Sequence, residues 1–114
     1  MMSRHKMIRL LSRLQALGEH AIQGSLVEVL LTGGTPTCGC HQDPNRRHGP
    51  HLYRRYRDEQ GRSRSMYVPR RQEGEVRQAV QAWGQMWEAM LELSPNNREA
   101  LRERLRRRSR RGGR

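Results

Sequence analysis

One stretch of the chain, residues 33–50, is incompatible with a helix or an internal strand and therefore divides the sequence in two. It reads GGTPTCGCHQDPNRRHGP and contains three prolines and four glycines. Proline removes a backbone donor and glycine weakens helices and strands, so we expect a loop here. A loop of this length is uncommon in a compact domain unless it is functional or held in place. The regular elements must therefore lie before and after it.

Before this loop the sequence predicts one helix and one strand. Apolar residues recur every three or four positions over residues 5–22, which is typical of an amphipathic helix, and Gly24 follows as a plausible stop. Residues 25–32 are short, partly β-branched and bounded by glycines. They predict a strand with Leu26 on one side and Val27, Val29 and Leu31 on the other.

After the loop the sequence predicts a β-hairpin. Residues 51–57 and 62–69 form its strands, and Gly61 suits the left-handed position of the turn between them. The alternation places apolar residues such as Leu52 and Val68 on one side and Arg55 and Arg57 on the other. It is imperfect, because Arg54 and Arg64 fall on the apolar side. This mixture indicates either an exposed ribbon or a different register.

A second amphipathic helix follows and is expected to end near Leu93. Its apolar stripe contains Trp83 and Trp87, together with Val76, Ala79, Val80, Met90 and Leu91. The stripe has two interpretations. Both tryptophans can belong to the core, or they can form a helical interface in a homodimer or with a larger protein partner.

Beyond Leu93, the pair Ser94-Pro95 predicts the start of a third helix, with serine as the N-cap and proline in the first turn. Residues 106–114 read RRRSRRGGR, a block of like charge that we expect to be disordered. The fold class is therefore α+β. We expect an N-terminal helix, a small three-stranded antiparallel sheet with a long Cys/His loop, two C-terminal helices and a disordered basic tail. One domain spans residues 1–105. With 33% hydrophobic residues and no Phe, its core must be thin.

The charge is strongly positive and is concentrated in two segments. The net charge is +12, and 22 of the 23 basic residues are arginine. Residues 46–71 and residues 98–114 each contain nine arginines against two acidic residues, a net +7 each. A codon bias toward arginine can explain the ratio of Arg to Lys but not the net charge. Such an imbalance is typical of proteins that bind a polyanion, above all nucleic acid. The candidate binding residues are Arg54, Arg55, Arg57, Arg62, Arg64, Arg106, Arg107 and Arg108.

The predicted hairpin combines these arginines with tyrosines. A two-stranded ribbon fits the major groove of DNA, and Tyr or Arg planes stack on unpaired bases. The sequence therefore does not decide between DNA and RNA as the partner. The alternative is that Tyr53, Tyr56 and Tyr67 belong to the core and the arginines keep an edge ribbon soluble.

Five possible metal ligands lie close together, four in the loop and one directly after it: Cys38, Cys40, His41, His48 and His51. Thiolates and imidazoles suit Zn²⁺, which takes four of them in structural sites and would hold the loop. The Cys-x-Cys spacing is not that of a standard zinc finger. The alternative is two buried thiols and some loop histidines.

The runs GSLVEVLLTGGTPTCGC, HGPHLYRRY and GRSRSMYVP resemble a family of small uncharacterised bacterial proteins, classed as a domain of unknown function, over roughly residues 24–69. That family's pattern is G-S-L-V-E, C-G-x-P-x-C-x-C, H-G-P-Y and Y-V-P. The resemblance implies a Cys3His zinc site and an association with mobile elements or phages. Here Gly33 replaces the first cysteine, so Cys38, Cys40 and His48 remain. Either His41 or His51 completes the set, or the metal has been lost and packing holds the loop.

No catalytic constellation is evident, and we do not expect an enzyme. Nucleophilic chemistry needs a rigidly placed thiol and base, and a metal-dependent nuclease needs clustered carboxylates, whereas the eleven acidic residues are scattered. The sequence lacks an apolar signal region and a membrane span. These features predict a soluble cytoplasmic protein.

Overall fold

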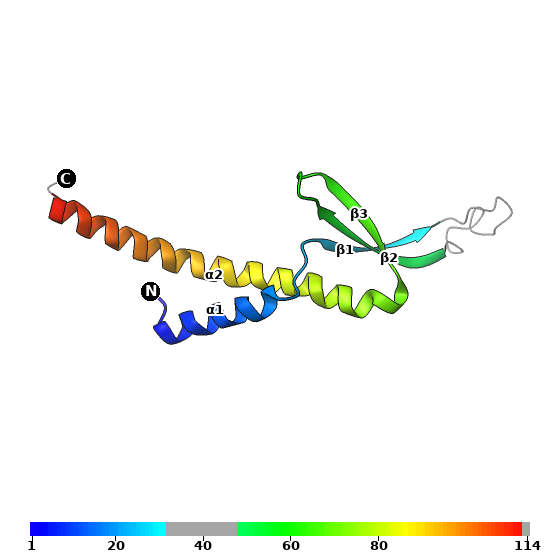
Figure 1. Cartoon of the computed structure of the whole chain (residues 1–114), viewed down its shortest axis with the longest axis horizontal. Coiled ribbons are helices and arrows are strands. Elements are labelled where there is room, and N and C mark those ends of the chain that lie inside the picture. Colours follow the sequence, from blue (N-terminus) through cyan, green and yellow to red (C-terminus); the bar gives the residue numbers. More distant parts are fainter. Residues whose placement is uncertain (32–47, 113–114) are drawn as a thin grey trace. The chain divides into compact units, whose positions relative to one another are not determined.

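The computed structural model describes residues 1–31 and 48–112 and has the predicted α+β fold (Figure 1). Its elements, in chain order, are α1 (Arg4–Gly18), β1 (Ser25–Leu31), β2 (His48–Arg57), β3 (Ser63–Val68), the 3-10 turn η3 (Arg70–Gln72) and α2 (Glu73–Gly112). The chain forms two compact units. The helical unit comprises Met1–Ala21 and Ala82–Arg114, and the sheet unit comprises Ile22–Gln81.

The sheet unit contains three antiparallel strands in the order β1-β2-β3. Leu52 pairs with Glu28 on one side and with Val68 on the other, and Arg55 pairs with Ser25 and Ser65. Because side chains alternate along a strand, Leu26, Glu28, Leu52, Arg54, Tyr56, Arg64, Met66 and Val68 share one face. This is the division that the sequence predicts, including the two arginines on the apolar side.

The first turns of α2 lie against this face, which we call the helix-covered face. Leu52 and Val68 are only 2% and 3% exposed there. Arg77 forms an ion pair of 2.9 Å with Glu28 of β1, and the Ile22 amide donates to the carbonyl of Ala79 at 3.1 Å. The start of α2 is therefore held to β1 by an ion pair and to the segment before β1 by a backbone hydrogen bond.

In the helical unit, α1 runs antiparallel to α2. Lys6 pairs with Glu92 at 2.7 Å, and the Met2 amide donates to Asn96 Oδ1 at 2.9 Å. Ser3 caps α1 by accepting from the Lys6 amide at 3.1 Å. α1 ends at Gly18, before the predicted residue 22, because the chain turns at Leu17, whose carbonyl accepts from the amides of both His20 and Ala21.

The prediction of two C-terminal helices is wrong, because α2 continues through Pro95. Proline removes the hydrogen bond to the carbonyl of Leu91, but Leu91 and Pro95 are both exposed and water can satisfy that group. Leu93 is buried and Asn96 binds the Met2 amide. The helix is thus held on both sides of the proline.

Residues 106–112, which the sequence predicts to be disordered, are the last turns of α2. Glu99 and Glu103 explain this difference. Glu99 pairs with Arg102 at 3.1 Å, and Glu103 pairs with Arg106 at 3.1 Å and with Arg107 at 3.4 Å. These pairs have helical spacing, and basic residues at a helix C-terminus interact favourably with its dipole.

The interpretation of the tryptophan stripe as core is also wrong. The buried residues of α2 are Ala82, Ala89 and Leu93. Trp83 is 39% exposed and Trp87 is 56% exposed. The buried face of α2 is thus rotated about the helix axis by about 100°, or one residue, from the face that contains the tryptophans.

Candidate nucleic-acid interface

The second face of the sheet, which we call the outer face, carries cationic and hydroxyl side chains together. The register aligns Ser25, Arg55 and Ser65 across the three strands, with Arg57 beside Ser63 at the hairpin end. All five side chains are exposed. They line a shallow concavity of about 540 Å³. Guanidinium and hydroxyl groups are both donors, so this concavity is suited to an anion.

Aromatic side chains occupy the other half of the outer face. Tyr53 and Tyr67 meet edge to face with ring centroids 5.7 Å apart, and His51 lies 6.0 Å from Tyr67. Tyr67 is 46% exposed. Exposed aromatic planes next to arginines are the usual surface for stacking unpaired bases.

Arg54 lies on the helix-covered face and is held within the protein. Its guanidinium donates to the carbonyl of Gln23 at 2.7 Å and lies 3.8 Å from the centre of the Tyr56 ring. The first contact connects β2 to the segment before β1, and the second lies within β2. Arg54 therefore stabilises the sheet unit rather than presenting a free cation.

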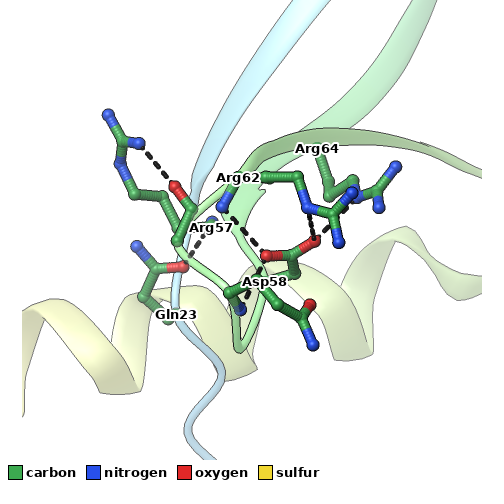
Figure 2. Close-up of polar contacts among 7 residues, drawn as sticks. Gln23, Arg57, Asp58, Arg62 and Arg64 are labelled. Atoms are coloured by element: carbon green, nitrogen blue, oxygen red, sulfur yellow. Dashed lines mark hydrogen bonds and ion pairs between the residues drawn. The ribbon is translucent and has the colours of Figure 1, made fainter.

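Arg62 and Arg64 surround Asp58 in the hairpin turn (Figure 2). The Asp58 carboxylate accepts from the Arg62 amide at 2.9 Å and from Arg64 Nε at 2.9 Å. It also accepts from the Gln60 amide at 3.0 Å. The backbone hydrogen bond from Arg62, followed by the side-chain hydrogen bond from Arg64, lowers the pKa of Asp58 below its ordinary value. A carboxylate ionised in this way partly neutralises both arginines.

Arg57 is oriented by the same turn. Its amide donates to Gln23 Oε1 at 3.0 Å and its guanidinium donates to the carbonyl of Gly61 at 2.8 Å (Figure 2). A guanidinium has five N–H donors, so this bond leaves others available. Within the described part of the chain, the Arg55 side chain has no polar partner. Of the five hairpin arginines predicted, Arg55 and Arg57 are the ones that line the outer face.

The arginines predicted in the tail lie at the exposed end of α2. Arg106 and Arg107 both pair with Glu103, whereas Arg108 has no polar partner in the described ranges. They belong to the helical unit, and the hairpin arginines belong to the sheet unit.

The predicted metal ligands Cys38, Cys40 and His41 lie outside the described residues, and His48 is described by its backbone alone. That backbone pairs with Leu31, so β1 ends where β2 begins. In residues 1–31 and 48–112, no group of three or more His, Cys, Asp or Glu side chains is placed to hold a metal.

The sequence reasoning did not identify three serines as part of the candidate site. Ser25, Ser63 and Ser65 become neighbours of Arg55 and Arg57 only through strand pairing. A signal for this was present in the alternation Ser63-Arg64-Ser65 opposite Arg55 and Arg57. Recognising it required the register of the hairpin.

These features define a small α+β protein with one cationic sheet face and a long, basic C-terminal helix. A model of the family described as a domain of unknown function (DUF6788) matches residues 3–78, and the chain belongs to this family. The match agrees with the resemblance noted in the sequence at the level of a domain of unknown function. Neither the curated proteins nor the solved structures contain a match. None of the described helices is long and apolar enough to cross a membrane.

Proposed function

We propose that this protein is a non-catalytic, cytoplasmic nucleic-acid-binding accessory protein of mobile elements or phages. The observation that supports this proposal best is the composition of the outer face. Arg55 and Arg57 share one concavity with three serine hydroxyls, and the exposed ring of Tyr67, beside the half-buried Tyr53, continues the same face. Phosphates would occupy the concavity and bases would stack on Tyr67.

The basic end of α2 would add a second, sequence-independent contact. Residues 98–112 contain eight arginines and two glutamates, a net +6. A helix with this charge attracts phosphates over a distance of about one Debye length, or roughly 8–10 Å. Arg106, Arg107 and Arg108 belong to this segment and would contribute mainly affinity rather than base preference.

The full-length protein should bind short duplex DNA, single-stranded DNA and RNA with an affinity that falls steeply with salt. For about six phosphate contacts, the association constant should drop roughly 10³-fold between 50 and 200 mM salt, since each contact releases counterions. Fluorescence anisotropy with labelled oligonucleotides at several salt concentrations measures this dependence. Absent or salt-insensitive binding of all three nucleic acids would contradict the proposed function.

A structural zinc ion is the second part of the proposal. Cys38, Cys40 and His48, with His41 or His51, offer the thiolate and imidazole ligands that Zn²⁺ prefers, and the pairing of Leu31 with His48 places one of them beside the end of β1. Native mass spectrometry of the untagged protein should show one zinc per chain that a chelator removes. The C38S/C40S variant should lack it, whereas H20Q, a histidine change outside the set, should retain it. Metal-free wild-type protein purified with zinc present would exclude the site.

A further inference from the structure

The helical unit has too little core for its length. Its buried residues are Ala82, Ala89 and Leu93, all from α2, and α1 has none. Large apolar side chains are instead exposed along α2: Trp83, Trp87, Met90, Leu101 and Leu105 are 39%, 56%, 41%, 47% and 52% exposed. An exposed row of this kind is typical of a protein interface.

These side chains lie on one side of α2, in two apolar groups separated by Ser94 and Arg98. We call them together the tryptophan seam. Trp83, Trp87 and Met90 each directly follow a residue on the inner side of α2: Ala82, Met86 and Ala89. On α1, Ile8 and Leu11 likewise follow the half-buried Met7 and Leu10, and are 53% and 51% exposed. In an antiparallel pair of right-handed helices, the position after the core residue points to the same side on both helices. The seam is therefore broadened by α1.

The second half of the seam lies where α1 no longer accompanies α2. The last polar contact between the two helices is that of Met2 with Asn96. Leu101 and Leu105 lie beyond it, at the helical spacing that continues Trp83, Trp87 and Met90. In the part of the chain that the structure describes, nothing covers them.

The seam is complementary to itself when the helix is reversed. Trp87 and Leu101 both lie seven residues from Ser94, and Trp83 and Leu105 both lie eleven residues from it. Two α2 helices that cross antiparallel at Ser94 therefore place each tryptophan opposite a leucine. A two-fold axis of this kind satisfies both halves of the seam at once.

Charge favours the same orientation. Residues 82–97 contain Glu88 and Glu92 and no basic residue, whereas residues 98–112 carry a net +6. A parallel pair would place two +6 segments side by side. The antiparallel pair places each one along the weakly acidic half of the other helix and keeps their centres about 33 Å apart, several Debye lengths.

We propose that the protein forms an antiparallel homodimer through the tryptophan seam, with Leu101 and Leu105 of each copy on Trp87 and Trp83 of the other. The two α1 helices would complete a four-helix arrangement through Ile8 and Leu11. The interface uses the helical unit alone, so this proposal does not depend on nucleic-acid binding.

Light scattering of the full chain after size exclusion, without nucleic acid and at 300 mM salt, should give twice the monomer mass of 13.4 kDa. The L101E variant should raise the dissociation constant at least tenfold while leaving the helix content unchanged, because Leu101 is exposed within one copy. The Q81E variant adds the same charge at an exposed position off the seam and should remain dimeric. A monomeric wild type at 100 µM, or equal dimerisation of L101E and Q81E, would overturn the proposal.

Orientation is tested by placing the photoreactive residue p-benzoylphenylalanine at position 105. The antiparallel dimer should yield a cross-linked peptide containing Trp83 of the other copy. Positions 105 and 83 of one helix are about 33 Å apart, so this product can form only between chains. Cross-links from position 105 of one copy to residues near position 105 of the other copy would indicate a parallel pair. That result would refute the proposed interface.

Discussion

Replacing Arg55 and Arg57 by glutamine should reduce the affinity for nucleic acid by about 10- to 100-fold at 100 mM salt and reduce the salt slope by about two. These are the arginines that the strand register places together on the outer face, beside Ser25, Ser63 and Ser65. Anisotropy titrations at several salt concentrations measure both quantities, and circular dichroism shows whether the sheet is retained.

The R9Q/R13Q variant is the matched control for this experiment. It removes the same two charges from exposed positions of α1, in the other unit. If the outer face is the site, the control should lose much less affinity than R55Q/R57Q. Equal losses in the two variants would mean that only the total charge of the chain matters.

Replacing Gly24 by alanine should destabilise the sheet unit by roughly 2–4 kcal/mol, which combines backbone strain with a clash. Gly24 has a φ of 149°, a conformation that residues with a side chain rarely adopt. An added Cβ would lie 2.7 Å from the carbonyl oxygen of Arg55 and 3.1 Å from Arg54 Cγ. Chemical denaturation monitored by circular dichroism measures the loss.

Two other glycines separate the causes of this effect. Gly61 has a φ of 78° but open space around it, so G61A should cost only about 1–2 kcal/mol. Gly84 lies inside α2, again in open space, and G84A should increase stability by about 0.5–1 kcal/mol. Wild-type stability of G24A would refute the close approach of Gly24 to β2.

Period-two alternation made the sheet predictable. It placed Leu52 and Val68 on one face and Arg55 and Arg57 on the other, and Gly61 marked the turn between β2 and β3. What it could not reveal is which guanidinium groups have neighbours. Arg54 stacks on Tyr56 within β2, and Arg64 binds Asp58, a contact that depends on the folded turn.

The long helix was harder to predict because two apolar stripes run along it. The larger one contains both tryptophans, whose large aromatic side chains make it the obvious candidate for the core. The face near α1 instead consists largely of small residues such as Ala82 and Ala89, and the Met86 side chain comes within 3.5 Å of the Cβ that Gly18 lacks. Pro95 added a second false signal, because its position after a serine resembles a helix start.

The structure also supplies a physical reason for the run Gly24–Glu28, part of the resemblance noted in the sequence. Gly24 allows the chain to approach β2, and Ser25 lines the concavity. Leu26 lies on the helix-covered face, and Glu28 pairs with Arg77 at the start of α2. The family match ends at residue 78, just after this pair. The residues of the tryptophan seam on α2 lie beyond it, whereas Ile8 and Leu11 of α1 lie within it.

The aromatic residues are divided between the two units. All three tyrosines, Tyr53, Tyr56 and Tyr67, belong to the sheet unit, and both tryptophans belong to the helical unit. Tryptophan emission can be excited selectively, so it reports on the surface of α2 alone, while tyrosine resonances in NMR spectra report on the sheet. The protein thus contains a separate label-free optical or magnetic reporter for each of its two units.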